Sequence, residues 1–76
     1  MSKQYLKTET EALVCYNEFD GECTDKDGAF LIICNRPDDT GCLCDNGDEE
    51  VYVKLNDLYV DTDKYEKIQE LAKNYH

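Results

Sequence analysis

The sequence predicts an α+β fold: a small antiparallel sheet of three or four strands with one C-terminal helix packed on a face. The sheet is predicted by a short apolar run over residues 29–34 and by alternating apolar and polar residues over 50–55. The helix is predicted by apolar side chains that recur at helical spacing between residues 63 and 75. A chain of 76 residues is expected to form one small acidic domain over residues 1–76, with a thin core.

The N-terminal part of the chain contains one ambiguous segment, residues 11–19. Residues 1–10 before it are polar, and we expect a frayed start or a short edge strand there. Thr8 and Glu11 match a capping box, which favours a helix over 11–19. Residues 13–16, however, are rich in the residue types that suit a strand. We predict a strand, because a hairpin partner follows close behind it.

The next stretch consists of turns around one apolar strand. Residues 20–28 predict an acidic, turn-rich loop. Residues 29–34 are continuously apolar and bounded by Gly28 and Pro37, which is typical of a short buried strand. Residues 38–41 predict another turn.

A β-hairpin is predicted around the pair Asn46-Gly47, which is favoured in type I′ turns. The turn joins residues 42–44 to residues 50–55. In the second arm the apolar residues share one face, and Tyr52 points to the other. Tyr52 is therefore a candidate for an exposed contact.

The C-terminal helix is the clearest element in the sequence. Asp61 or Thr62 can cap it, and Asp63 suits its positive N-terminus. Its apolar stripe consists of Tyr65, Ile68, Leu71, Ala72 and Tyr75. A helix of about 13 residues is not stable alone, so we expect the stripe to pack on the sheet.

The charge of the chain is strongly negative and unevenly distributed. There are 18 acids and 8 bases, for a formal net charge of −10, and residues 9–63 hold 16 of the acids but only 3 of the bases. Isolated buried carboxylates are very costly, so we expect most of them on the surface. Such a field repels nucleic acid and anionic membranes and attracts basic surfaces. The alternative is that the charge serves solubility alone.

No segment of the sequence predicts export or insertion into a membrane. The first eight residues are polar and lack the apolar region of a signal peptide. No apolar run approaches the roughly 18 residues that are needed to span a bilayer. We therefore expect a cytoplasmic protein.

Five cysteines leave three interpretations open. Four thiolates could close a tetrahedral zinc site, and the candidate ligands are Cys23, Cys34, Cys42 and Cys44. Their spacing lacks the paired Cys-x₂₋₄-Cys knuckles of structural zinc sites, and a Cys34–Cys42 disulfide is the second interpretation. We favour the third, in which reduced and partly buried cysteines act as small apolar residues and the protein has no cofactor.

No set of residues in the sequence predicts catalysis. A nucleophilic cysteine needs a nearby base, and the only histidine is His76, the last residue. Residues 25–28 match part of a calcium loop, but Cys23 and Cys34 occupy its two anchor positions. The scattered glycines form no phosphate loop. We therefore expect no enzymatic activity.

These features predict a non-catalytic acidic protein that occupies a basic surface of a partner, specifically of a nucleic-acid-binding protein. The carboxylates then stand where phosphates otherwise sit. The candidate contact residues are loop carboxylates and one tyrosine: Asp20, Glu22, Asp25, Asp27, Asp38, Asp39, Asp45, Asp48, Glu49, Glu50 and Tyr52. The hypothesis requires these carboxylates to gather in one exposed cluster. We expect no direct binding of nucleic acid or membranes.

In size, charge and the lack of a catalytic residue set, the chain resembles in general profile small phage proteins that block restriction or CRISPR enzymes. The resemblance implies an inhibitor, or nucleic-acid mimic, of a host defence enzyme, although no motif assigns the chain to a family. The alternatives are a small cysteine- and zinc-stabilised adaptor, and an accessory structural protein whose charge serves only solubility.

Overall fold

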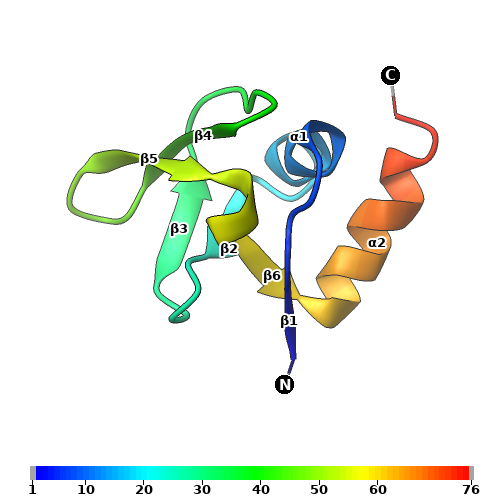
Figure 1. The fold of residues 1–76 in the computed structure, drawn as a ribbon, viewed down its shortest axis with the longest axis horizontal. Helices are drawn as coiled ribbons and strands as arrows, with labels where there is room; N and C mark the ends of the chain where they lie inside the picture. The colour runs from blue at the N-terminus through cyan, green and yellow to red at the C-terminus, as the bar shows by residue number, and fades with distance from the viewer. Residues whose placement is uncertain (1, 76) are drawn as a thin grey trace.

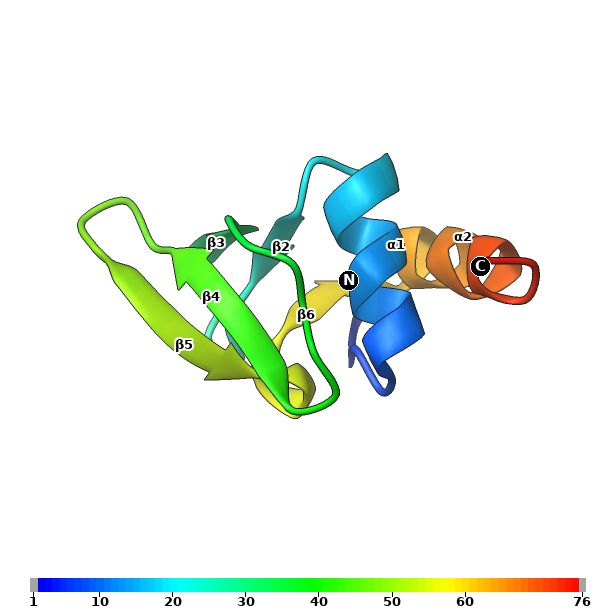
Figure 2. The same ribbon diagram turned by 90° about the horizontal axis from the view of Figure 1, so that it is seen from above.

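The computed structural model describes residues 2–75 and contains one six-stranded antiparallel sheet with two helices (Figures 1 and 2). The strands are ordered β1-β6-β2-β3-β4-β5 across the sheet. In chain order the elements are β1 Lys3–Tyr5, α1 Glu9–Glu18, β2 Glu22–Thr24, β3 Phe30–Ile33, β4 Gly41–Asp45, β5 Glu50–Lys54, a 3₁₀ turn Leu55–Asp57, β6 Tyr59–Asp61 and α2 Thr62–Ala72. The α+β class holds, whereas the prediction of three or four strands and one helix is wrong.

The hydrophobic core lies on one face of the sheet, which we call the inner face. Cys23 on β2 and both Leu31 and Ile33 on β3 are buried there. They belong to one cluster with Val14 of α1 and Ile68 of α2, so both helices contribute to the same core. The helices lie beside one another near β1 and β6, and the β4–β5 hairpin extends to the opposite end of the molecule (Figure 1).

Residues 11–19 belong almost entirely to helix α1, so the prediction of a strand there is wrong. The capping box explains the outcome, because Thr8 Oγ1 accepts a hydrogen bond from the Glu11 amide at 3.1 Å. The helix ends at Glu18, and Asp20 then turns the chain with a positive φ of 59°. The predicted hairpin partner, the strand over residues 29–34, pairs instead with β2, which follows the helix.

Strand β2 lies inside the segment 20–28, which was expected to be a loop, and it pairs with β3. The strand predicted over residues 29–34 is confirmed as β3, but it is buried on one face only. Its two inner-facing side chains are buried, whereas Phe30 and Ile32 leave 56% and 37% of their surfaces exposed. The reason is that both helices contribute to the inner side, so nothing within residues 2–75 covers the other side of β3.

The β4–β5 hairpin is confirmed, but its turn differs from the prediction. A type I′ turn requires positive φ at both central residues, and of this pair only Gly47 has one, at 100°. Residues 46–49 form a longer connection instead. Asn46 Oδ1 accepts hydrogen bonds from the amides of Asp48 and Glu49 at 2.9 and 3.0 Å, which holds the turn in place.

Two three-residue strands complete the sheet. The edge strand expected within residues 1–10 is confirmed as β1, which pairs with β6 at one end of the sheet. Strand β6 was not predicted, and it joins β2 through a single pair, Thr24 with Tyr59. Strands this short show no periodicity from which the sequence could predict them.

Helix α2 begins where the sequence predicts, with Asp61 at the N-cap position, although the Asp61 side chain makes no capping hydrogen bond. Tyr65 and Ile68 are buried, but Leu71 is 43% exposed and does not belong to the buried stripe. The helix packs chiefly against α1 and only secondarily against β6 and β1, which corrects the expected packing on the sheet. Within residues 2–75 no helix is long and apolar enough to cross a membrane.

A polar contact between the helices lies at the edge of the core. Glu11, at 8% exposure, is the only charged side chain that is buried among residues 2–75. The Tyr65 hydroxyl donates to its carboxylate at 3.0 Å, and the Lys7 amide donates to it at 2.8 Å. The Lys7 ammonium lies 4.4 Å from the Tyr65 ring centroid and 4.6 Å from that of Tyr5. These contacts connect α1, α2 and the end of β1.

Removal of the Tyr65 hydroxyl is expected to destabilise the fold. Tyr65→Phe leaves the buried Glu11 carboxylate without one donor, so the free energy of unfolding should fall by about 1–3 kcal/mol in a urea titration. Tyr75→Phe is the control, because the Tyr75 hydroxyl bonds the exposed Asn17 side chain, and its effect should stay within about 0.5 kcal/mol. Equal effects of the two substitutions would contradict this role of the Glu11–Tyr65 contact.

Candidate interaction surface

The predicted contact residues lie on four separate segments of the fold. Asp20 precedes β2 and Glu22 begins it, two residues lie in the β2–β3 turn, two in the β3–β4 loop, and four at the end of the β4–β5 hairpin, whose strand β5 also contains Tyr52. All of these carboxylates are exposed except Asp25, which is half-buried. In Figure 1 the β2–β3 turn lies at the bottom, the β3–β4 loop at the top and the hairpin turn at the left. The structure therefore does not bring the eleven predicted residues together into one cluster.

Some of these carboxylates hold the turns in which they lie. Asp25 Oδ1 accepts from the amides of Asp27 and Ala29 at 2.8 and 2.9 Å. Asp38 Oδ1 accepts from the amides of Gly41 and Thr40, and these bonds lower the pKa of Asp38 to about 2.

Tyr52 takes part in the turn around Asp38 rather than standing free. Its hydroxyl donates to Asp38 Oδ1 at 3.2 Å and also contacts the Thr40 hydroxyl. The residue nevertheless remains open to solvent, since 54% of its surface is exposed. The hydroxyl therefore fixes the position of an exposed aromatic ring.

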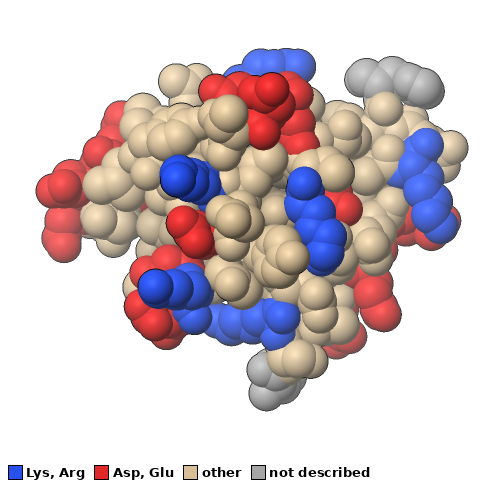
Figure 3. All heavy atoms as spheres, viewed as in Figure 1, with Lys and Arg blue, Asp and Glu red and all other residues tan. Residues whose placement is uncertain are grey.

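The hairpin end is the most concentrated acidic region, and we call it the acidic end: Asp45, Asp48, Glu49 and Glu50. No Lys or Arg occurs anywhere in residues 37–53. In Figure 3 several red groups lie among tan atoms at the end of the molecule where Figure 1 places this hairpin. The one ion pair among residues 2–75 is Lys73 with Glu70 on α2, so no ion pair neutralises the acidic end.

The sheet side that faces away from the core, the outer face, continues from the acidic end. Its side chains on β2 to β5 are Glu22, Thr24, Phe30, Ile32, Leu43, Asp45, Glu50, Tyr52 and Lys54. Glu22, Ile32, Asp45 and Glu50 are direct neighbours in register across four strands. Three carboxylates and one exposed apolar side chain thus form a single row across the outer face.

The apolar members of the outer face are the functional candidates that the sequence did not single out. Phe30 and Ile32 lie in the run Phe-Leu-Ile-Ile, in which no polar residue marks the solvent side. A continuous apolar run usually indicates a strand that is covered on both faces, whereas β3 is covered on its inner face only. No signal in the sequence could have found them, because only the placement of both helices on the inner side leaves this face open.

The cysteines considered as zinc ligands differ in burial. Four thiols are buried on the inner side, those of Cys15, Cys23, Cys42 and Cys44, while Cys34 is exposed. All five are free, so the alternative Cys34–Cys42 disulfide is not formed. Among residues 2–75 no group of three or more His, Cys, Asp and Glu side chains could hold a metal ion. His76 lies outside the described residues.

The buried thiols behave as part of the core. The Cys42 and Cys44 sulfur atoms are 3.7 Å apart. Contact with Cys44, together with burial, raises the pKa of Cys23 and Cys42, and burial raises the pKa of Cys15 to about 11. The thiols of Cys15, Cys23 and Cys42 therefore stay protonated, which suits packing rather than nucleophilic chemistry. Hydrogen bonds from Cys23 and Cys42 lower the pKa of Cys44, so its sulfur is the acceptor of the cluster.

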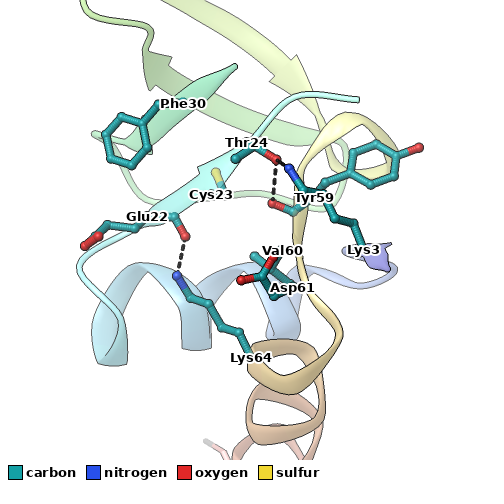
Figure 4. Close-up of a pocket in the computed structure, with 9 residues that line it drawn as sticks. All are labelled: Lys3, Glu22, Cys23, Thr24, Phe30, Tyr59, Val60, Asp61 and Lys64. Carbon is teal, nitrogen blue, oxygen red and sulfur yellow. Dashed lines mark hydrogen bonds between the residues drawn. The ribbon is translucent and has the colours of Figure 1, made fainter. Parts of the chain in front are cut away.

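A hollow of about 190 Å³ lies where β2 and β6 diverge after their single pair (Figure 4). Lys64 Nζ donates to the Glu22 carbonyl oxygen at 2.5 Å, and Lys3 Nζ donates to Thr24 Oγ1 at 3.3 Å. Both ammonium groups therefore bind the protein itself and bridge across the gap. We interpret the hollow as a joint in the sheet rather than as a ligand site.

The difference in thiol exposure predicts a simple reactivity pattern. With an aromatic disulfide reagent at neutral pH, the native protein should release one equivalent of thiolate, from Cys34, and all five thiols should react after unfolding. Cys34→Ser should abolish the native reaction without changing the number of thiols that only unfolding exposes. Rapid native reaction of two or more thiols would contradict the described packing.

Comparison with known proteins identifies no relative of this chain. No family model matches the chain, and neither a curated protein nor a solved structure matches it. The function of the chain is therefore inferred from its own charges, contacts and exposed side chains.

Proposed function

We propose that this protein is a non-catalytic binding protein that occupies the basic surface of a nucleic-acid-binding partner. The observation that carries the proposal is the acidic end: four exposed carboxylates on one hairpin, with no base in residues 37–53 and no ion pair among the described residues to neutralise them. The proposal is narrower than the sequence hypothesis, because it assigns recognition to the hairpin and the adjoining row rather than to all eleven residues.

The backbone of the acidic end is held in place before any partner arrives. Asn46 Oδ1 accepts from two amides of the turn, and Asp45 Oδ1 accepts from the Gly47 amide at 2.7 Å. A preorganised binding surface loses less conformational entropy on association than a flexible acidic tail. The carboxylates of Asp48, Glu49 and Glu50 accept no hydrogen bond from a described residue, and they can accept from a partner.

A basic surface that binds nucleic acid is the natural complement of this array. Such surfaces place Lys and Arg to meet successive phosphates, and their affinity depends strongly on salt. Neighbouring strands of a sheet lie about 4.8 Å apart. Carboxylates on adjacent strands therefore present closely spaced negative charges on a rigid support. Charge complementarity of this kind accelerates encounter and excludes acidic competitors.

The other functions considered have no specific observation in their favour. A zinc-stabilised adaptor would need a group of ligands that residues 2–75 do not provide. A role for the charge in solubility alone does not require a stretch without bases at one end of the molecule.

Neutralisation of the acidic end should remove partner binding. Immobilised protein should retain nucleic-acid-binding proteins from a cell lysate, and duplex DNA should displace them. Raising the salt from about 0.1 M to about 1 M shortens the Debye length from about 10 Å to about 3 Å and should release them. The triple variant Asp48→Asn, Glu49→Gln, Glu50→Gln should lose most of this retention, as quantified by mass spectrometry.

A matched control separates local recognition from total charge. Glu18→Gln, Glu66→Gln and Glu70→Gln remove the same charge from exposed positions on the helices, and this variant should retain the partners. The proposal fails if both triple variants lose the same fraction of bound protein, or if DNA does not compete.

A further inference from the structure

The outer face combines exposed aromatic rings with unpaired carboxylates. Phe30 and Tyr52 leave 56% and 54% of their surfaces exposed, and Ile32 lies between Glu22 and Asp45 in the row. Soluble proteins generally place large apolar side chains in contact with something, and grouped exposed ones mark interaction sites. Nothing in residues 2–75 covers this side of β3, β4 and β5.

We propose that the outer face is the docking surface itself and that it recognises arginine side chains of the partner in preference to lysine. The inference rests on the proposed function. It adds the face of the sheet that binds the partner and the type of basic side chain that this face selects. The occupant is the surface of a protein in which arginines surround an apolar centre.

The arrangement around Phe30 favours arginine over lysine. Phe30 on β3 is the diagonal neighbour of Glu22 on β2, because Glu22 pairs with Ile32 and Thr24 with Phe30. Figure 4 shows the ring of Phe30 and the carboxylate of Glu22 directed to the same side. A guanidinium group can stack on an aromatic ring while it donates two parallel hydrogen bonds to a carboxylate, and an ammonium group cannot do both.

A second aromatic–carboxylate pair lies on β5, at an edge of the sheet. Tyr52 and Glu50 are two residues apart on β5, so both point outward, and Tyr52 pairs with Leu43 on β4. The contact of its hydroxyl with Asp38 holds the ring in place. Two aromatic rings with adjacent carboxylates therefore flank Ile32 and Leu43, and arginine at a partner's interface can use both.

A second copy of the chain is a poor occupant of this face. Each copy carries a formal net charge of −10, and a symmetric contact would oppose the carboxylate rows of the two copies. Like charges facing one another across an interface are strongly unfavourable. Charge complementarity instead selects a basic partner.

Two peptides of equal charge test the inference on the full chain. Hexa-arginine and hexa-lysine are titrated into ¹⁵N-labelled protein, and the affinity and the shifted amides are read from NMR spectra. Hexa-arginine should bind about two- to fivefold more tightly, the factor expected for exposed cation–π contacts. The shifts should lie in β3, β4 and β5. Phe30→Leu should weaken hexa-arginine about twofold and leave hexa-lysine unchanged, whereas Phe30→Tyr should retain the preference.

The possible outcomes separate the two proposals. Equal affinity for the two peptides would overturn the preference for arginine. Shifts confined to α1 and α2 would overturn the assignment to the outer face. Either result would leave the proposal of a basic partner intact. Failure of both peptides to bind at low salt would overturn the proposed function as well. A concentration-dependent dimer in sedimentation, with shifts on the outer face, would assign the face to a second copy and overturn the inference.

Discussion

Two short helices can cover only one face of a six-stranded sheet, and the rest of the structure follows from that constraint. The helices contain 10 and 11 residues, and their buried side chains join the inner-facing side chains of the strands in one core. The contact of Tyr65 with the buried Glu11 carboxylate connects the two helices. The side chains on the opposite side of β3, β4 and β5 remain in contact with solvent, among them Phe30 and Tyr52. The outer face is therefore a consequence of where the two helices pack as much as of local sequence.

The same division explains why one end of the molecule stays acidic. Several of the few basic side chains are held in the half that contains the helices and β1. Lys7 contacts Tyr5 and Tyr65, Lys64 bonds β2, and Lys3 bonds Thr24. The hairpin end has no comparable partner, so its carboxylates repel one another in the free protein. A basic partner would relieve that repulsion, and this relief adds to the attraction between the two surfaces.

The elements predicted correctly are those with strong local signals. The helix from Thr62 shows an apolar stripe, the β4–β5 hairpin shows alternation, and β3 is a bounded apolar run. Helix α1 was missed although its capping box was visible, because the residue types of 13–16 suit either structure and only tertiary pairing decides between them. Strands β2 and β6 are too short to leave a pattern.

The candidate site was predictable in charge but not in shape. Composition indicates exposed carboxylates, and the acidic end confirms that they are exposed at the hairpin. Register across the sheet, which aligns Glu22, Ile32 and Asp45, arises from strand order and cannot be inferred from residues far apart in the chain. The contact of the Tyr52 hydroxyl with Asp38 likewise depends on the fold, since the two residues lie on different segments of the chain.

The central claim is that one side of the sheet is uncovered, and solvent relaxation measures this directly. A neutral gadolinium chelate added to the protein in solution broadens the proton signals of side chains that it can approach. We expect strong relaxation for the side chains of Phe30, Ile32 and Tyr52. We expect little for Leu31 and Ile33, which alternate with Phe30 and Ile32 along β3 and are buried. Similar protection of Phe30 and Leu31 would show that the outer face is covered, and it would contradict the account.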